Sequence, residues 1–221
     1  MHTVHKVTVC AQHGGAILAG MDGIELMATA MHAAKSRLDV CAGNLANVSS
    51  DGFRKRVAHA ALTANGLVAS SSVDAAQGPL KRTGRNFDLA LVGTGGFFVR
   101  NAAGHALESR SGSFTRNALG QLANDRGEIL LGAHGPFVAT ADATIDARGV
   151  VRDAGTEIGR IRLRSGTTLE SGFLESSNVD AVREMVDVLS AQRAFETAQK
   201  TLSALDEERQ KDVDDVARVK S

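Results

Sequence analysis

Residues 24–48 read IELMATAMHAAKSRLDVCAGNLANV, and this stretch decides the fold. Its apolar positions recur at alternating steps of three and four without a break: Ile24, Met27, Met31, Ala34, Leu38, Cys41, Leu45 and Val48. Such spacing is typical of the a and d positions of a coiled coil, so it predicts a long amphipathic helix with a narrow apolar seam. A core helix of a globular domain is the alternative, but Lys35, Arg37 and Asp39 lie off the seam. Cys41 lies on the seam and is expected to be a small buried hydrophobe.

Both ends of this helix have recognisable signals. Residues 47–52 (NVSSDG) are turn formers, and Gly52 can adopt a positive φ. We expect Asn44, Asn47 and Gly52 to form the joint between the helix and the β-structure, which makes 21–52 the N-terminal assembly helix. Asp22 is the predicted N-cap. Residues 1–20 have weak periodicity, and we expect them to be an extension that is disordered or not native.

Residues 53–172 have the pattern of a β-rich domain. Short apolar runs are separated by Gly, Asn and Asp turns, without a repeat of fixed period. The predicted strands lie at Leu89–Val92, Phe97–Val99, Ile129–Leu131, Gly149–Val151 and the alternating Ile161–Arg164. Residues 70–72, three serines, are predicted to be a loop or a disordered tip.

A second helix is predicted within 173–221, the C-terminal assembly helix and charged tail. Asn178 is its predicted N-cap, with Asp180 in the first turn. One apolar stripe comes first, followed by another: Val182, Met185, Val186 and Leu189, then Phe195, Ala198, Leu202 and Leu205. Because the phase slips between the two stripes, a continuous coiled coil is less secure here than at the front. Residues 206–221 are highly charged and are expected to order only on a partner.

The combined pattern predicts an α+β protein. Its N- and C-terminal amphipathic helices would form a coiled-coil-like assembly domain, with a β-rich middle domain. Apolar seams at both ends need partners, and fully burying a Leu or Met contributes about 1.5–3 kcal/mol. We therefore expect the helices to pair with each other and with the same helices of neighbouring copies. The expected packing anchors of this assembly interface are Met27, Met31, Leu38, Leu45, Met185, Leu189, Phe195 and Leu202.

The composition argues against several classes of function. The chain has 25 basic and 25 acidic side chains, a net charge of zero, eight Phe and neither Tyr nor Trp. It therefore lacks the basic excess and the stacking residues of a nucleic-acid-binding protein. The short basic run Arg54–Arg56 is expected to be a solvated face or a subunit contact. No apolar run is long enough to span a bilayer, and no secretory signal is recognisable.

Catalytic and metal-binding motifs are not recognisable either. The two cysteines have no CxxC partner, the histidines have no HExxH spacing, and no GxSxG elbow occurs. The glycine-rich segment 92–97 lacks a GK[ST] ending and predicts a tight β-turn. Four carboxylates sit in turn-like surroundings and suggest little: Asp142, Asp146, Asp153 and Glu157. We therefore expect no enzyme, no cofactor and no metal, with a β-rich hydrolase that uses Asp or Glu as the alternative.

Three ordered blocks resemble the flagellar rod and hook axial proteins. The first block is Leu38–Val40 with Asn44–Phe53 (NLANVSSDGF). The second runs from Gln77 through Gly96–Val99 to Arg110–Arg116, Gly120 and Leu122. The third comprises Gly172–Asp180, Glu184–Val186 and Ala191–Glu196. Together the blocks span roughly residues 21–206.

The resemblance implies a structural subunit of the bacterial flagellar basal-body rod, most similar to the proximal type. Such a subunit would polymerise into a helical tube through its terminal helices, with the β-rich part facing outward. The implied partners are other copies, other rod and hook axial proteins, and the flagellar type III export apparatus. Nucleic acid and membrane insertion are not implied, and the implied location is the periplasmic rod, reached without a cleaved signal peptide. Alternatives are a distal rod or hook-like subunit and a cytoplasmic coiled-coil adaptor.

The chain departs from the family pattern at several places. Glu108-Ser109 stands where the family usually has Tyr-Thr, and Gly43 and Ala198 each replace a frequent Asn. The segment between Ile161 and Gly172 is shorter than usual, which implies a trimmed outer β-domain.

Overall fold

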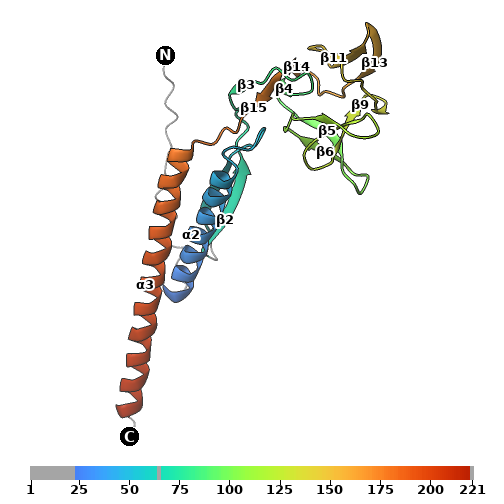
Figure 1. Ribbon diagram of the computed structural model, residues 1–221. Coiled ribbons are helices and arrows are strands. Elements are labelled where there is room, and N and C mark those ends of the chain that lie inside the picture. The colour runs from blue at the N-terminus through green and yellow to red at the C-terminus, as the bar shows by residue number, and fades with distance from the viewer. Residues whose placement is uncertain (1–22, 64–65, 220–221) are drawn as a thin grey trace. The chain divides into compact units, whose positions relative to one another are not determined.

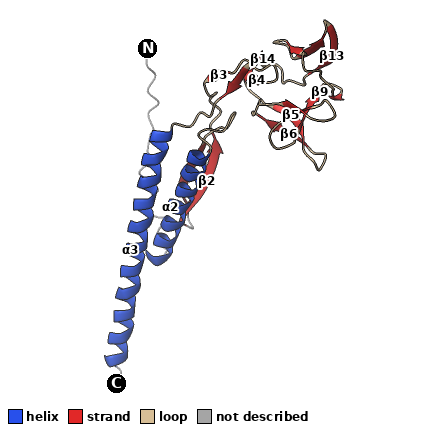
Figure 2. Ribbon diagram, in the orientation of Figure 1, coloured by secondary structure: helices blue, strands red, loops and turns tan. Residues whose placement is uncertain are grey.

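The computed structural model describes residues 23–63 and 66–219, in which a helix at each end flanks a series of strands (Figure 1). The helices are α2 (Gly23–Ala46) and α3 (Ala181–Val219). The strands are β1 (Arg56–Thr63), β2 (Gly66–Val73), β3 (Leu80–Arg82), β4 (Leu89–Val92), β5 (Phe97–Arg100), β6 (Ala106–Ser109), β7 (Thr115–Arg116), β8 (Leu122–Ala123), β9 (Ile129–Gly132), β10 (Gly135–Pro136), β11 (Thr144–Ile145), β12 (Val150–Asp153), β13 (Thr156–Arg160), β14 (Thr168–Ser171) and β15 (Phe173–Glu175). This content of helix and strand confirms the α+β class (Figure 2). The predicted N-cap Asp22 and the predicted extension 1–20 lie outside the described residues.

The described residues form two compact units. The helical unit contains residues 23–42, 57–63, 66–72 and 185–219, which are most of α2, the β1–β2 pair and most of α3. The β-rich unit contains residues 43–56 and 73–184.

Residues 70–72 lie in β2, so the predicted loop at these serines is wrong. Since serine has no strong preference for strands, the pairing with β1 decided their conformation.

In the helical unit, α2 and α3 run antiparallel. Arg37 Nη2 lies 3.0 Å from Asp187 Oδ1, and a Cβ added at Gly23 would lie 3.8 Å from Leu205 Cδ1. Residues near the N-terminus of α2 therefore contact residues farther along α3, as they must in an antiparallel pair. The Leu67 N–H of β2 donates a hydrogen bond to Thr29 Oγ1 at 3.3 Å. Helix α2 thus lies between α3 and the β1–β2 hairpin (Figure 1).

Helix α3 has two apolar faces. One face is buried or half-buried and keeps steps of three and four: Val188, Ala191, Phe195, Ala198, Leu202 and Leu205. In contrast, Met185 and Leu189 are 52% and 55% exposed. Since Leu189 and Ala191 are two positions apart, they point about 200° apart around the helix. The phase slip that the sequence predicts between Leu189 and Phe195 therefore marks two apolar stripes on opposite faces of α3.

The core of the β-rich unit comes from short antiparallel strands. The fully buried apolar side chains include Leu89, Leu91, Phe97, Val99, Leu122, Leu130, Val151 and Leu169. Phe97 and Phe114 meet edge to face, with ring centroids 5.3 Å apart. The largest sheet has the order β6-β5-β9-β8-β7 with β10 beside β9, and a smaller one has the order β11-β12-β13. Two late strands return to early ones, since β14 pairs with β4 and β15 with β3.

Four turns of this unit have the same construction. In each, the side-chain oxygen of an Asn or Asp accepts a hydrogen bond at 2.9 Å from the N–H of the fourth residue after it. A glycine with φ between 75° and 86° precedes that residue, a conformation that glycine adopts without a steric cost. Each turn joins consecutive strands, and the turns are Asn101–His105, Asn117–Gln121, Asn124–Glu128 and Asp146–Val150.

The sequence predicted four of the five named strands. Leu89–Val92 matches β4, Phe97–Val99 and Ile129–Leu131 lie within β5 and β9, and part of Gly149–Val151 lies in β12. The predicted strand at Ile161–Arg164 is wrong. Ile161 forms only an isolated bridge with Gly132, and the guanidinium of Arg162 instead lies 4.5 Å from the centre of the Phe98 ring.

Candidate assembly surface and the joint beside it

The predicted anchors of the assembly surface fall into three groups. Met27, Met31, Leu38 and Leu45 are half-buried along α2. Phe195 and Leu202 are half-buried on the face of α3 that continues the line of buried Ala191. Met185 and Leu189 are exposed on the opposite face of α3. The last group is the one available to another molecule, and its role stays a prediction. Cys41 is 6% exposed, which confirms its predicted burial.

Asn44 connects the end of α2 to the first residue of β1. Its side chain is buried, and its Oδ1 accepts the Arg56 N–H at 2.8 Å. Its Nδ2 donates to the Arg56 carbonyl at 2.8 Å and to Glu184 Oε2 at 3.2 Å. An amide can donate and accept at once, so one Asn side chain satisfies both backbone groups of Arg56.

Glu184 is a buried carboxylate in the first turn of α3. Its residue is 0% exposed, and its Oε1 forms an ion pair with Lys55 Nζ. A buried charge is tolerated only when it is paired and hydrogen-bonded, which Lys55 and Asn44 achieve together. Lys55 was expected to be solvated or to contact another subunit, and this expectation is wrong because its ammonium group is needed inside the chain.

Asn178 holds two segments rather than the start of α3. Its Oδ1 accepts the Lys55 N–H at 2.6 Å, and its Nδ2 donates to the Ala76 carbonyl at 3.0 Å. The predicted N-cap role is therefore wrong. Asp180 Oδ1 instead accepts the N–H groups of Val182 and Arg183 at 3.0 and 3.1 Å, which is the N-cap arrangement.

The other two predicted joint residues lie in the turn that follows α2. Asn47 Nδ2 donates to the Gly43 carbonyl at 2.8 Å, which satisfies one of the free carbonyls at the helix end. Gly52 has a φ of 68°, and its N–H donates to the Glu175 carbonyl at 2.6 Å. A Cβ at Gly52 would collide with the Arg110 carbonyl group, so both the conformation and the space require glycine.

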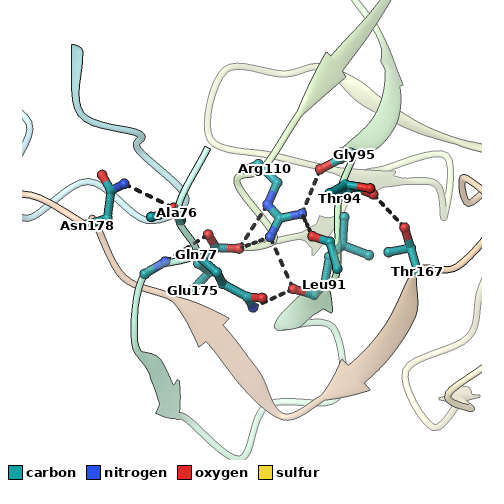
Figure 3. Close-up of polar contacts among 12 residues, drawn as sticks. Ala76, Gln77, Leu91, Thr94, Gly95, Arg110, Thr167, Glu175 and Asn178 are labelled. Atoms are coloured by element: carbon teal, nitrogen blue, oxygen red, sulfur yellow. Dashed lines mark hydrogen bonds and ion pairs between the residues drawn. The ribbon is translucent and has the colours of Figure 1, made fainter. Parts of the chain in front are cut away.

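Arg110 and Glu175 form a buried ion pair in the β-rich unit (Figure 3). Their side chains are 7% and 2% exposed, and Arg110 Nη2 lies 2.6 Å from Glu175 Oε2. Arg110 Nη1 also donates to the carbonyls of Gly93 and Gly95 at 2.9 and 2.6 Å. The glycine-rich loop therefore directs carbonyl oxygens at an arginine, whereas a phosphate site would need free N–H donors.

The burial of the charged residues Arg110, Glu175 and Glu184 was not predicted from the sequence. For Glu184 a signal existed, because it precedes Val188 and Ala191 at the same steps of four and three along α3. A charge on the buried side of a helix needs a partner, and here the partner is Lys55. Arg110 and Glu175 lie 65 positions apart in the sequence, and no local pattern indicates their contact.

The pKa shifts of the described residues reflect structural contacts. Burial raises the pKa of the Asp51 carboxyl, and a hydrogen bond to Asp88 raises the pKa of the Arg85 guanidinium. The hydrogen bond from the Val150 N–H lowers the pKa of the Asp146 carboxyl. The Asp146 carboxylate thus stabilises its turn. Glu157 is exposed, and its Oε1 lies 3.9 Å from Arg160 Nη2. Asp146 therefore has a role in a turn, and Glu157 takes part in a surface ion pair.

The described part of the chain offers neither a metal site nor a membrane span. Within residues 23–63 and 66–219, no group of three or more His, Cys, Asp or Glu side chains could hold a metal ion. No helix described there is both long and apolar enough to cross a membrane.

The chain is similar to flagellar basal-body rod proteins. The sequence model described as flagellar basal body rod FlgEFG protein C-terminal matches residues 170–214. The flagellar basal-body rod protein FlgF of Escherichia coli K12 is 30% identical over 234 residues, which cover 81% of this chain and 93% of that protein. The flagellar basal-body rod proteins FlgG of Agrobacterium fabrum and Bacillus subtilis are each 27% identical. They cover 85% and 78% of this chain and are themselves matched over 96% and 90% of their length.

The chain is shorter than these relatives inside the matched region. The match to the E. coli protein has 234 positions but covers 81% of 221 residues, which is about 179, so about 55 positions have no counterpart here. In the structure, the connection from Ile161 to β14 is a short turn closed by a hydrogen bond from the Thr167 N–H to the Arg164 carbonyl.

Proposed function

The chain belongs to the family of flagellar basal-body rod proteins, and from this premise we propose that it is a structural rod subunit that polymerises into a helical tube through its terminal helices. The observation that carries the proposal is the contrast in burial between the two units. Every large side chain that is less than 2% exposed among the described residues lies in the β-rich unit. The large apolar side chains of the helices are half-buried or exposed. This is expected of helices that bury these side chains against other molecules.

The polar joint around Asn44 and Glu184 supports this function. It contains the last turn of α2, the first turn of α3 and the residues that enter β1. A tube built from helices needs their ends held at a fixed geometry, because small errors would add up along the assembly. Buried, fully paired polar groups supply such geometric specificity.

We further propose the partners and the location. The partners are other copies of this chain, other rod and hook axial proteins, and the flagellar type III export apparatus. The location is the periplasmic rod, reached without a cleaved signal peptide, and the chain has no active site. The proximal rod type is the position proposed. The distal rod type is the alternative position.

Purification of intact basal bodies tests this function. The wild-type chain is expected in the rod fraction, and Leu38→Asp is expected to be absent from it, because a charge is placed on the apolar seam of α2. Leu119→Asp is the matched control, since Leu119 is exposed in the β-rich unit and its variant should assemble normally. A wild-type chain that fails to purify with basal bodies would contradict the proposal, and so would normal assembly of Leu38→Asp.

A further inference from the structure

The joint brings an amine, an amide and a carboxylate together in the interior of the β-rich unit. The three groups belong to Lys55, Asn44 and Glu184, and all three residues lie in that unit. Asn44 and Glu184 are 1% and 0% exposed. Glu184 Oε1 forms the ion pair with Lys55 Nζ, and Glu184 Oε2 accepts a hydrogen bond from Asn44 Nδ2 at 3.2 Å. One carboxylate therefore contacts both a primary amine and the nitrogen of a primary amide.

The Lys55 side chain passes alongside the Asn44 amide. Lys55 directly precedes Arg56, whose N–H donates to Asn44 Oδ1 at 2.8 Å. The Lys55 ammonium group lies at the carboxylate that accepts from Asn44 Nδ2. The side chain thus begins near the amide oxygen and ends near the amide nitrogen, with the amide carbon between them. Reacting groups held together in this way react far faster than the same groups free in solution.

The surroundings of the amide supply the groups that attack by an amine requires. Glu184 is a general base for the ammonium group and, once protonated, a general acid for the amide nitrogen. The Arg56 N–H already donates to Asn44 Oδ1, the atom on which negative charge develops when a nucleophile adds to the amide carbon. Nucleophile, base, acid and oxyanion donor therefore converge on one amide.

We propose that Lys55 and Asn44 form an isopeptide bond in the folded chain. Glu184 takes a proton from the Lys55 ammonium group, and the neutral Nζ attacks Asn44 Cγ. Glu184 then gives that proton to Nδ2 and takes a second one from the attacking nitrogen. The bond from Cγ to Nδ2 breaks, and ammonia leaves. The products are a secondary amide, ammonia and a neutral Glu184 carboxyl group, so atoms and charge balance without any other reactant.

Removal of a buried ion pair favours the reaction. A charged ammonium and carboxylate are replaced by uncharged groups, and such a replacement in a protein interior is often neutral or stabilising. The Lys55 side chain is 21% exposed, which gives ammonia a route to solvent. Glu184 lies 140 positions after Asn44, so the reacting groups meet only when the chain has folded. The bond would join the end of α2 to the start of β1, and it does not depend on the proposed rod function.

Mass spectrometry of the purified full chain tests the bond. The folded wild-type chain is expected to weigh one ammonia less than its sequence. Trypsin is expected to release residues 38–54 joined through Asn44 to Lys55. A folded wild-type chain that keeps its full mass after prolonged incubation at neutral pH overturns the inference.

Two variants remove the chemistry and change the joint little in size. Lys55→Arg keeps a cation beside Glu184, but a guanidinium stays protonated and does not attack an amide. Glu184→Gln keeps the shape of the side chain and cannot accept the proton. Both variants are expected to keep the full mass. Lys81→Arg is the matched control, because Lys81 is an exposed lysine of β3, and it is expected to lose ammonia as the wild type does.

The variants also separate this bond from other losses of ammonia. An asparagine that cyclises on its own backbone loses the same mass, but it would do so in Lys55→Arg as well, and that result overturns the inference. Circular dichroism shows whether each variant is folded, and the mass of the wild-type chain decides the inference even where neither variant folds. Absence of the chain from basal bodies would remove the proposed function and leave the bond standing.

Discussion

The β-rich unit and the helical unit differ in how much of their stability comes from contacts within the chain. In the β-rich unit, Phe97, Leu122 and Leu130 are fully buried, and its buried charges are paired. In the helical unit, Ala191 and Cys41 are buried, but the larger side chains of α3 remain half-buried or exposed. The first unit buries its own apolar groups and pairs most of its buried polar groups, with Arg54 Nε as an exception. The second unit leaves apolar surface for other molecules.

This difference shows where folding ends and assembly begins. Large apolar side chains left in water contribute nothing until a partner covers them, after which each contributes about 1.5–3 kcal/mol. Changes in the β-rich unit should therefore reduce the stability of the isolated chain. Changes on the exposed face of the helices should reduce assembly instead. Of the four experiments that follow, one compares the two units directly and three measure how strongly the β-rich unit depends on its own contacts.

The largest expected effect is that of Arg110→Ala in the β-rich unit. The change leaves the Glu175 carboxylate buried without its partner, which costs about 3–5 kcal/mol of unfolding free energy. Urea denaturation followed by circular dichroism measures it. Arg164→Ala is the control, because the Arg164–Glu108 pair is exposed and contributes about 0–1 kcal/mol. Equal losses in the two variants would contradict the idea that burial of the pair matters.

A matched pair of leucine truncations compares the two units directly. Leu122→Ala removes a fully buried side chain and is expected to cost about 2–5 kcal/mol. Leu189→Ala removes an exposed one and is expected to change the stability of the isolated chain by at most about 0.5 kcal/mol. Thermal unfolding of both variants checks this, and a large loss in Leu189→Ala would mean that α3 buries this residue within one chain.

Asn44→Ala is expected to have an intermediate effect at the joint. It removes both hydrogen bonds to the Arg56 backbone and the one to Glu184, and unsatisfied buried groups cost about 1–3 kcal/mol. Asn47→Ala removes the hydrogen bond to the Gly43 carbonyl and the one from the Ser50 hydroxyl, neither of them fully buried, and should cost less, about 0.5–1.5 kcal/mol. Denaturant midpoints rank the two variants, and the reverse order would contradict the role assigned to Asn44.

The smallest effect is expected for Asp146→Asn, through pH. Hydrogen bonds from the Val150 and Arg148 N–H groups lower the pKa of Asp146 in the folded chain. The carboxylate therefore stabilises the fold above its unfolded pKa of about 3.9, and this contribution is lost as pH falls through the lower folded pKa. The substitution should keep the turn, because an Asn side chain begins each of the other three turns. The difference between the urea midpoints of variant and wild type should begin to shrink as pH falls below about 3.9 and should reach its low-pH limit below the folded pKa; a difference that does not change with pH would contradict this.

The sequence predicted the helices because their apolar spacing of three and four is a local property. It also predicted strands such as β4 and β9, which are apolar runs between turns. It did not predict the opposite faces of α3, because steps along a sequence do not say which face meets α2. The serines at 70–72 were missed as strand because pairing with β1, and not propensity, determines their conformation.

The residues of the joint were likewise predictable only in part. Asn44, Asn47 and Gly52 were singled out from turn chemistry, and the structure places all three between α2 and the segments that follow it. The charged residues around the joint, Lys55, Glu175 and Glu184, were not singled out as buried or paired groups. Those contacts join residues 65 to 140 positions apart in several cases, such as Arg110 with Glu175 and Asn44 with Glu184, and no local pattern encodes them.

Hydrogen exchange tests the contrast between the two units most directly. In the dilute isolated chain, amides of β5, β8 and β9 should be protected near the level of global unfolding, and amides of α3 beyond Met185 should exchange much faster. In isolated basal bodies the α3 amides should gain protection while the strands change little. Equal protection of α3 and the strands in the dilute chain, with no gain on assembly, would contradict the account.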